Sequence, residues 1–108
     1  MDSIIATEAL GALAQATRLD AFRLLVRNEP QGMAAGQIAR ALGVPANTLS
    51  SHLAILGRAG LVTFERQSRS IVYRADISAL RNLMVFLAND CCGGSKELCA
   101  PLLEELAS

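Results

Sequence analysis

The chain has 108 residues, 52% of them hydrophobic, with three Phe, one Tyr and no Trp. This length suits one domain with a single core, and the few aromatic residues favour a mostly α class filled with Ala and Leu. The formal net charge is zero, which excludes a chain that is basic throughout. Residues 40–81 nevertheless hold six Arg against two acidic residues, while the segments before and after them carry −1 and −3. We therefore expect a local basic surface that can meet nucleic acid.

The sequence shows no targeting or membrane segment. Its start, "MDSIIATEAL", lacks the basic region of a signal peptide. The longest stretch without Asp, Glu, Lys or Arg, residues 41–57, contains Pro, Asn, Thr, two Ser and His, which is too polar for a membrane span. We expect a cytoplasmic protein with no membrane partner. In that reducing compartment, three cysteines argue against a disulfide framework.

Two helices are predicted at the N-terminus. The first covers roughly residues 3–15, where apolar residues recur with the helical period at Ile4, Ile5, Ala9, Leu10, Leu13 and Ala14. The second begins at Thr17, a residue type suited to an N-cap, and continues through "RLDAFRLLVRN". Its apolar stripe is Leu19, Phe22, Leu25 and Val26. "EPQG" then breaks the chain with Pro30 and Gly32.

The next segment follows the helix-turn-helix pattern. "MAAGQIARALG" predicts a short helix ended by Gly43, and "ANTLSSHLAILGRAG" predicts a second helix closed by Gly60. The inward residues are Ile38, Ala39 and Leu42 in the first, and Leu49, Leu53 and Leu56 in the second. Two short helices joined by about three residues are typical of this motif.

The period then changes from that of a helix to that of a strand. In "LVTFERQSRSIVYRAD", two runs of alternating residues flank the polar "QSRS", which predicts a β-hairpin with Arg69 at its tip. From Ile77 the helical period returns, to about Asn89, and "PLLEELA" is a possible short terminal helix. The predicted fold is mostly α with a β-hairpin wing, in the order α-α-α-α-β-β-α. We place a winged helix-turn-helix domain at residues 1–90 and a cysteine-containing tail at 91–108.

A helix that enters the major groove of DNA needs short polar side chains near its N-terminus and apolar ones behind them. Residues 47–52 have this division, with Leu49 as the single inward residue. An ordinary solvated helix face, with Asn47 or Thr48 as a cap, is the alternative. The arginines at the hairpin tip favour DNA, because they are suited to phosphates or a minor groove. The candidate DNA-binding residues are Gln37, Asn47, Thr48, Ser50, Ser51, His52, Arg66 and Arg69.

Three stretches carry a resemblance to a known family: "LAQATRLDAFRLL", "GQIARALGVPANTLSSHLAILGRAGLV" and "RQSRSIVYRAD". Together they resemble the ArsR family of winged helix-turn-helix metalloregulators over nearly the whole chain. The most specific element, "LSSHLAILGRAGLV", is similar to the family's recognition helix and the turn into the wing. The resemblance implies a homodimeric repressor that binds an imperfectly palindromic operator in double-stranded DNA and releases it when a toxic metal or metalloid binds. Many relatives have Gly at the wing tip, whereas "QSRS" has none.

The last predicted helix also indicates a dimer. It carries Ile77, Leu80, Leu83, Met84, Phe86 and Leu87, a wider apolar face than a small monomer readily covers. The resemblance implies that the first and last helices build the interface. We assign dimerisation to Ile5, Leu10, Leu80, Leu83, Met84 and Leu87. A two-fold axis through this interface places two recognition helices about 34 Å, one DNA turn, apart.

All three cysteines lie within "NDCCGGSKELC". Cys91, Cys92 and Cys99 supply three soft sulfur donors, and the two glycines between them give the backbone freedom to bring the third near the first two. The adjacent pair does not form a relaxed disulfide, since neighbouring Cα atoms are about 3.8 Å apart. The segment is therefore a candidate metal or metalloid site.

Three thiolates with no fourth donor favour As(III), which takes three sulfurs in a pyramid, and Sb(III) shares that preference. Zinc prefers four donors, and the single histidine, His52, lies in the predicted recognition helix. Cu(I) accepts a similar trigonal set. The resemblance agrees with As(III), because one subclass of the family carries a vicinal cysteine pair just after the last helix and a third cysteine downstream.

The sequence thus predicts an As(III)-responsive repressor with no catalytic cofactor and no enzymatic activity. Several alternatives stay open: a winged-helix repressor that senses thiol oxidation, or Cu(I), Cd or Zn, and a non-regulatory arsenic-binding protein. Incidental thiols on a tail are a further alternative. A thiol enzyme such as an arsenate reductase is disfavoured, because no phosphate-cradling loop and no base accompany any cysteine.

Overall fold

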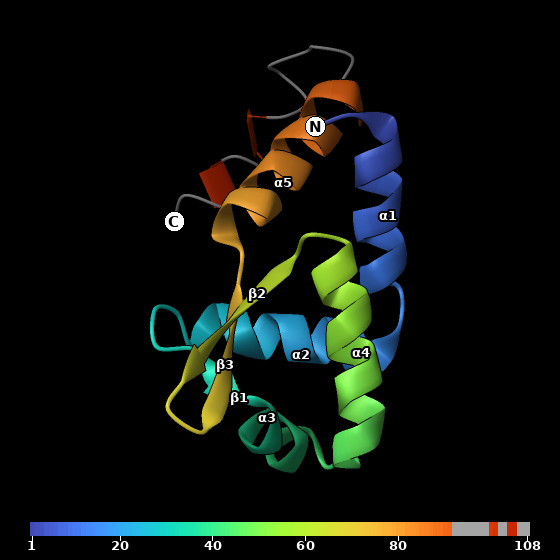
Figure 1. The fold of residues 1–108 in the computed structure, drawn as a ribbon. Helices are drawn as coiled ribbons and strands as arrows, with labels where there is room; N and C mark the ends of the chain where they lie inside the picture. Colours follow the sequence, from blue (N-terminus) through green and yellow to red (C-terminus); the bar gives the residue numbers. More distant parts are fainter. Residues whose placement is uncertain (92–99, 102–103, 106–108) are drawn as a thin grey trace.

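The structure, a computed structural model, describes residues 1–91, 100–101 and 104–105 (Figure 1). In chain order the elements are α1 (Ser3–Leu13), α2 (Ala16–Arg27), β1 (Met33–Ala34), α3 (Ala35–Leu42), α4 (Ala46–Arg58), β2 (Val62–Gln67), β3 (Ser70–Ala75) and α5 (Ile77–Cys91). The predicted winged helix-turn-helix fold, with a hairpin before the last long helix, is confirmed. Of the possible terminal helix in "PLLEELA", the described residues Pro101, Glu104 and Glu105 are helical. Most of the predicted tail lies outside the described residues.

One strand was missed by the sequence reading. Met33 and Ala34, expected inside the third helix, form β1 and pair antiparallel with Tyr73 and Val72 of β3. The sheet therefore has the order β1-β3-β2. A strand of two residues is too short to show an alternating pattern, and its partner lies about forty residues further along the chain.

Gly32 allows the chain before β1 to pass close to β3. It has a φ of +73°, and an added Cβ would lie 2.6 Å from the Tyr73 carbonyl oxygen and 2.8 Å from side-chain carbons of Val72 and Arg74. Only glycine permits both this conformation and this approach. The segment "EPQG", predicted as a break between helices, therefore brings the backbone at Gly32 into close contact with β3.

The predicted cap of the second helix was wrong. Thr17 lies inside α2, and Gln15 is the N-cap residue, with its side-chain oxygen accepting the Arg18 backbone N–H at 2.9 Å. A cap on α1 is also present, because the Asp2 carboxylate accepts the Ile5 N–H at 2.9 Å. Gln is a rarer N-cap than Thr, so residue preference alone pointed to the wrong residue.

The core lies where α1, α2, α3, α4 and the base of the wing meet. The predicted inward leucines of α4 are confirmed, since Leu49, Leu53 and Leu56 are fully buried or nearly so. The first predicted helix is present, and it turns small residues inward: Ala6, Ala9 and Ala12 are buried, whereas Ile4, Ile5 and Leu10 are exposed. Alanines allow α1 to pack closely while its large apolar side chains face outward.

The wing closes with a two-residue loop. Gln67 pairs with Ser70, which leaves Ser68 and Arg69 at the tip. Ser68 has a φ of +57° and is the non-glycine residue with positive φ among those described. A positive φ at the first of two loop residues is the pattern of a type II′ turn, where glycine is usual.

Candidate nucleic-acid interface

The first turns of α4 present a polar surface. Asn47, Thr48, Ser50 and Ser51 are exposed, whereas Leu49 between them is fully buried. The predicted division of this helix into an outward polar face and an inward apolar face is therefore present. Its N-cap residue is Pro45, which makes no side-chain capping bond. Asn47 and Thr48 are not N-caps but lie within the helix, where the Asn47 side-chain oxygen accepts the Thr48 N–H at 3.0 Å.

His52 lies differently from its polar neighbours. It is partly buried, and its Nδ1 lies 3.4 Å from Nη1 of Arg18 on α2. One ring nitrogen therefore contacts the protein body rather than solvent. Of the candidate DNA-binding residues on α4, His52 is the one with a side-chain contact to another helix among the described residues.

Gln37 has a structural contact of its own. Its side-chain oxygen accepts the backbone N–H of Ala34 at 2.9 Å, which satisfies a donor at the start of α3. The side chain is exposed, so its amide NH2 group remains accessible to an outside partner. Gln37 thus caps α3 and can still donate a hydrogen bond.

Two arginines lie at or next to the wing tip. Arg66 and Arg69 are exposed, and neither has an ion pair in the part of the chain that the structure describes. Arg74, at the base of the wing, instead forms a bidentate contact with Glu29, with an Nη2 to Oε2 distance of 2.6 Å. The hydrogen bond and the attraction to Glu29 raise the pKa of Arg74 above its ordinary value. The arginines in the basic middle of the sequence therefore differ, because Glu29 balances the charge of Arg74, whereas Arg66 and Arg69 remain available to an outside phosphate.

The first turns of α4 and the wing tip lie at the same end of the molecule (Figure 1). We call this the recognition end and define it as residues 35–52 and 66–71. It contains α3, the first half of α4 and the hairpin loop. Residues far apart in the sequence thus form one surface, as a helix and a wing must in order to contact neighbouring grooves of a duplex.

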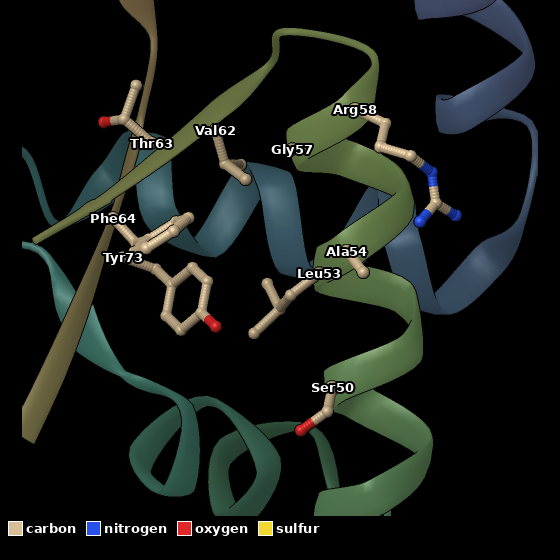
Figure 2. A pocket seen from close by; sticks show the side chains of 9 residues that line it. All are labelled: Ser50, Leu53, Ala54, Gly57, Arg58, Val62, Thr63, Phe64 and Tyr73. Atoms are coloured by element: carbon tan, nitrogen blue, oxygen red, sulfur yellow. The ribbon is translucent and has the colours of Figure 1, made fainter.

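A groove separates α4 from the wing. The groove has a volume of about 590 Å³. Figure 2 shows the residues that line it, which are Ser50, Leu53, Ala54, Gly57 and Arg58 of α4 and Val62, Thr63, Phe64 and Tyr73 of the wing. Phe64 is 69% exposed, and its ring centroid lies 5.9 Å from that of Tyr73. This exposed aromatic residue was missed as a candidate for the interface. Its position in the strand run next to the recognition helix was the available signal.

The opposite end of the molecule is apolar. Here α1 and α5 expose Ile4, Ile5, Leu10, Ile77, Met84 and Val85. We call it the apolar end and define it as residues 1–10 and 77–91. Of the predicted dimerisation residues, Ile5, Leu10 and Met84 are exposed and Leu80 and Leu87 are partly buried, whereas Leu83 is 3% exposed. Leu83 therefore packs within its own chain and leaves little surface for a partner.

The candidate metalloid ligands begin at this same end. Cys91 is the last residue of α5, while Cys92 and Cys99 lie outside the described residues. Among the described residues, no group of three or more His, Cys, Asp or Glu side chains is placed to hold a metal ion. Likewise, no described helix is both long and apolar enough to cross a membrane.

Comparisons with known proteins agree with this geometry. Residues 13–63 match a family model described as a helix-turn-helix domain. A Mycobacterium bovis protein fragment, described in its solution structure as the homodimeric winged helix-turn-helix DNA-binding domain of a possible ArsR-family regulator, has a crystal structure that is 30% identical. That match covers 80% of this chain and 91% of the fragment, with a TM-score of 0.64.

The chain belongs to the ArsR family. Two further solved structures are similar to this ArsR-family protein. An ArsR-like transcriptional regulator from Rhodococcus sp. RHA1 is 25% identical over 97% of this chain and 94% of its own, with a TM-score of 0.76. A possible transcriptional regulator for arsenical resistance is 29% identical over 74% and 80%, with a TM-score of 0.65. No curated protein matches the sequence. The chain is thus a winged helix-turn-helix transcriptional regulator of the kind that binds double-stranded DNA.

Proposed function

We propose that this ArsR-family regulator is an As(III)-responsive repressor that binds operator DNA as a homodimer and dissociates when arsenite binds Cys91, Cys92 and Cys99. The observation that carries the proposal is the position of the thiols. All three fall within nine residues that begin at the C-terminal residue of α5, at the apolar end. A structural relative described as a possible regulator for arsenical resistance supports the same ligand class.

The donor set suits the ligand. Three thiolates satisfy the pyramidal preference of As(III) or Sb(III), whereas a closed zinc site takes four donors. The chain's single histidine, His52, lies on α4 against Arg18 and belongs to the recognition end. The chain therefore has no further cysteine or histidine to complete a four-coordinate zinc site of nitrogen and sulfur donors beside Cys91, Cys92 and Cys99, which favours a trigonal metalloid over zinc.

The apolar end supports a homodimer. Ile4 is 72% exposed and Ile5 47% exposed on α1, and Met84 and Val85 are exposed on α5. Neighbouring apolar side chains of this size are rarely left in water by a stable monomer. A second copy that covers them across a two-fold axis leaves both recognition ends free for adjacent half-sites on DNA. The homodimeric Mycobacterium bovis relative supports this arrangement.

We further propose how the recognition end contacts DNA. Asn47, Thr48, Ser50 and Ser51 face base edges and phosphates in the major groove, and the NH2 group of Gln37 donates to the backbone. Arg66 and Arg69 contact phosphates or the adjacent minor groove. The groove of Figure 2 adjoins the recognition end at Ser50 and is lined by the exposed Phe64. We propose that Phe64 packs on a deoxyribose of the DNA backbone between the two grooves of the duplex.

The regulatory step is an allosteric coupling between two sites. Because Cys91 closes the helix that carries part of the apolar end, ligand binding there changes how two subunits meet and so the spacing of their recognition ends. Coupling free energies between sites are about 1–3 kcal/mol, which corresponds to roughly a 5- to 150-fold change in affinity. The effect is reciprocal, so operator DNA weakens arsenite binding by the same factor.

The test is an arsenite titration of fully reduced protein on the upstream region of its own gene. We expect operator affinity to fall at least about 5-fold with arsenite, and to stay unchanged in a Cys92→Ser variant. Ser95→Ala, within the same segment, is the matched control and should respond like the wild type. Parallel titrations with antimonite, zinc, cadmium and Cu(I) identify the preferred ligand.

Three results would redirect the proposal. Operator affinity that is unchanged by arsenite in reduced protein contradicts the arsenic-sensing role. A loss of affinity that follows an oxidant, and is reversed by a thiol reductant, supports a repressor that senses thiol oxidation. Tight arsenite binding without any sequence-specific DNA affinity supports a non-regulatory arsenic-binding protein.

A further inference from the structure

Arg18 joins three helices through one side chain. It lies in the first turn of α2, and its Nε donates to the Ala12 carbonyl oxygen of α1 at 2.6 Å. Its Nη2 donates to the Gly11 carbonyl oxygen at 3.4 Å, and its Nη1 lies 3.4 Å from His52 Nδ1 on α4. The end of α1, the start of α2 and the recognition helix therefore meet at one guanidinium group.

The donors of the Arg18 guanidinium face groups that can accept hydrogen bonds. The carbonyls at the C-terminal end of α1 carry partial negative charge, which a guanidinium stabilises. The Gly11 carbonyl also accepts the Ala14 backbone N–H at 3.2 Å, so Arg18 is its second donor. Since a guanidinium has only donors, His52 must accept at Nδ1 and keep its ring proton on Nε2. The planar fork of Arg18 holds its donors in fixed directions, so one side chain contacts both the end of α1 and the His52 ring.

His52 lies on α4 between a residue that faces outward and one that packs in the core. It directly follows Ser51, an exposed candidate for DNA contact, and precedes Leu53, which is 1% exposed in the core. On the other side of Arg18, α1 carries Ile5 and Leu10 of the apolar end. Arg18 thus lies between the helix that we propose for subunit pairing and the helix that we propose for DNA recognition.

We propose that Arg18 is a positioning residue that sets the angle of α4 relative to α1 through His52, so that operator affinity depends on a side chain that does not touch DNA. This inference rests on the proposed DNA-binding function. It also assigns His52 the role of an acceptor for Arg18 in place of a direct base contact. A change in how the α1 helices pair reaches the recognition end through this contact.

The first test compares two arginines on the same helix. Arg23 is exposed, and its side chain makes no hydrogen bond or ion pair with another described residue, so Arg23→Met removes the same charge without touching α1 or α4. We expect Arg18→Met to weaken binding to the operator at least about 5-fold at fixed salt, and Arg23→Met to change it less than about 2-fold. Equal losses in both variants mean a general charge effect and overturn the inference.

A second readout does not involve DNA. His52 is the chain's single histidine, so its imidazole gives one unambiguous set of nitrogen resonances in a long-range proton–nitrogen NMR spectrum. We expect the wild type to show the Nε2–H tautomer with a hydrogen-bonded Nδ1. Arg18→Met should shift the Nδ1 resonance to that of a free acceptor, and Arg23→Met should leave it in place. An unchanged Nδ1 resonance in Arg18→Met overturns the inference.

A double variant separates positioning from simple capping of α1. If Arg18 acts through His52, His52→Met alone reproduces the loss of operator affinity, and the double variant binds no more weakly than Arg18→Met. If Arg18 only caps α1, His52→Met alone binds like the wild type, which overturns the inference. Arg18→Lys serves if Arg18→Met unfolds, because it keeps a charge near α1 but lacks the fork that reaches His52. A wild type that binds no operator overturns the proposed function, whereas normal binding by Arg18→Met overturns this inference alone.

Discussion

The recognition end and the apolar end of this ArsR-family protein have opposite surfaces built on one core. At the recognition end, α4 exposes Asn47, Thr48, Ser50 and Ser51 while the wing exposes Arg66 and Arg69. At the apolar end, α1 and α5 expose Ile4, Ile5, Leu10, Met84 and Val85. The difference indicates two kinds of partner, since hydroxyls, amides and guanidinium groups suit a charged polymer, whereas aliphatic side chains suit another apolar surface.

The largest expected effect comes from placing a charge at the apolar end. Ile5→Glu should disrupt the homodimer, because an unpaired carboxylate buried in an apolar interface costs about 3 kcal/mol or more. The monomer should stay folded, since Ile5 is 47% exposed and an acidic residue suits the first turn of α1. Analytical ultracentrifugation and an operator-binding assay measure both consequences.

Leu19→Glu is the matched control for that substitution. Leu19 is 41% exposed but lies on α2, outside the apolar end, so we expect this variant to remain dimeric and to bind operator. A dimer that persists in Ile5→Glu contradicts the assignment of α1 to the interface.

Ser51→Ala should reduce sequence selectivity. Ser51 is exposed, and within the described residues its hydroxyl makes one long bond, of 3.4 Å, to the Asn47 carbonyl oxygen, so it can contact a base. Losing one such hydrogen bond costs about 1 kcal/mol on the cognate site and little on other sequences. Competition between operator and random DNA measures the ratio, with Ser78→Ala on α5 as the control. A sequence-independent loss would place Ser51 on the phosphate backbone instead.

Arg69→Ala should weaken DNA binding a few-fold on every sequence and lower the salt slope by about 1, as expected for one lost phosphate contact. Arg74→Ala provides the comparison within the same hairpin. Because Glu29 already pairs with Arg74, its loss should leave the salt slope nearly unchanged. Affinities measured over a range of salt concentrations compare the two variants, and equal slopes for both would show that the wing tip does not reach the duplex.

The smallest effect concerns the wing loop. Ser68→Gly should stabilise the fold by about 0.5 kcal/mol, because glycine accommodates the φ of +57° without the strain of a side chain. Ser70→Gly, in regular strand β3, should instead destabilise it by about 0.5–1 kcal/mol. Thermal unfolding of the two variants measures the sign. A lower melting temperature for Ser68→Gly would contradict the turn assignment.

Much of the fold could be predicted from periodicity, because one side of each long helix packs on the core. Leu49, Leu53 and Leu56 recur with the helical period and are all buried. Periodicity also predicted α1, but it marks an apolar stripe without saying whether its own chain or a second copy covers that stripe; the assignment of Ile5 and Leu10 to a dimer interface came from the resemblance. Only the structure shows which side of α1 packs on its own chain: small residues such as Ala9 are buried there, whereas Ile5 is exposed.

The sequence predicted which residue types form the candidate site, but it did not predict the side-chain contacts that these residues make. Exposed hydroxyls on α4 follow from their positions around buried Leu49, and arginines at a hairpin tip follow from the strand pattern. The Arg18–His52 contact spans 34 residues, and the pairing of Arg74 with Glu29 spans 45. Neither leaves a local signal in the sequence, because long-range pairs depend on tertiary packing. Both change the interpretation of the site, since they occupy groups that the sequence alone presents as free.

The central claim is that two recognition ends, joined through two apolar ends, bind one operator. A hydroxyl-radical footprint of the wild-type protein on the upstream region of its own gene tests it most directly. We predict two protected patches on one face of the duplex, about 10–10.5 base pairs apart from centre to centre. A single protected patch, or protection that does not depend on sequence, would contradict the account.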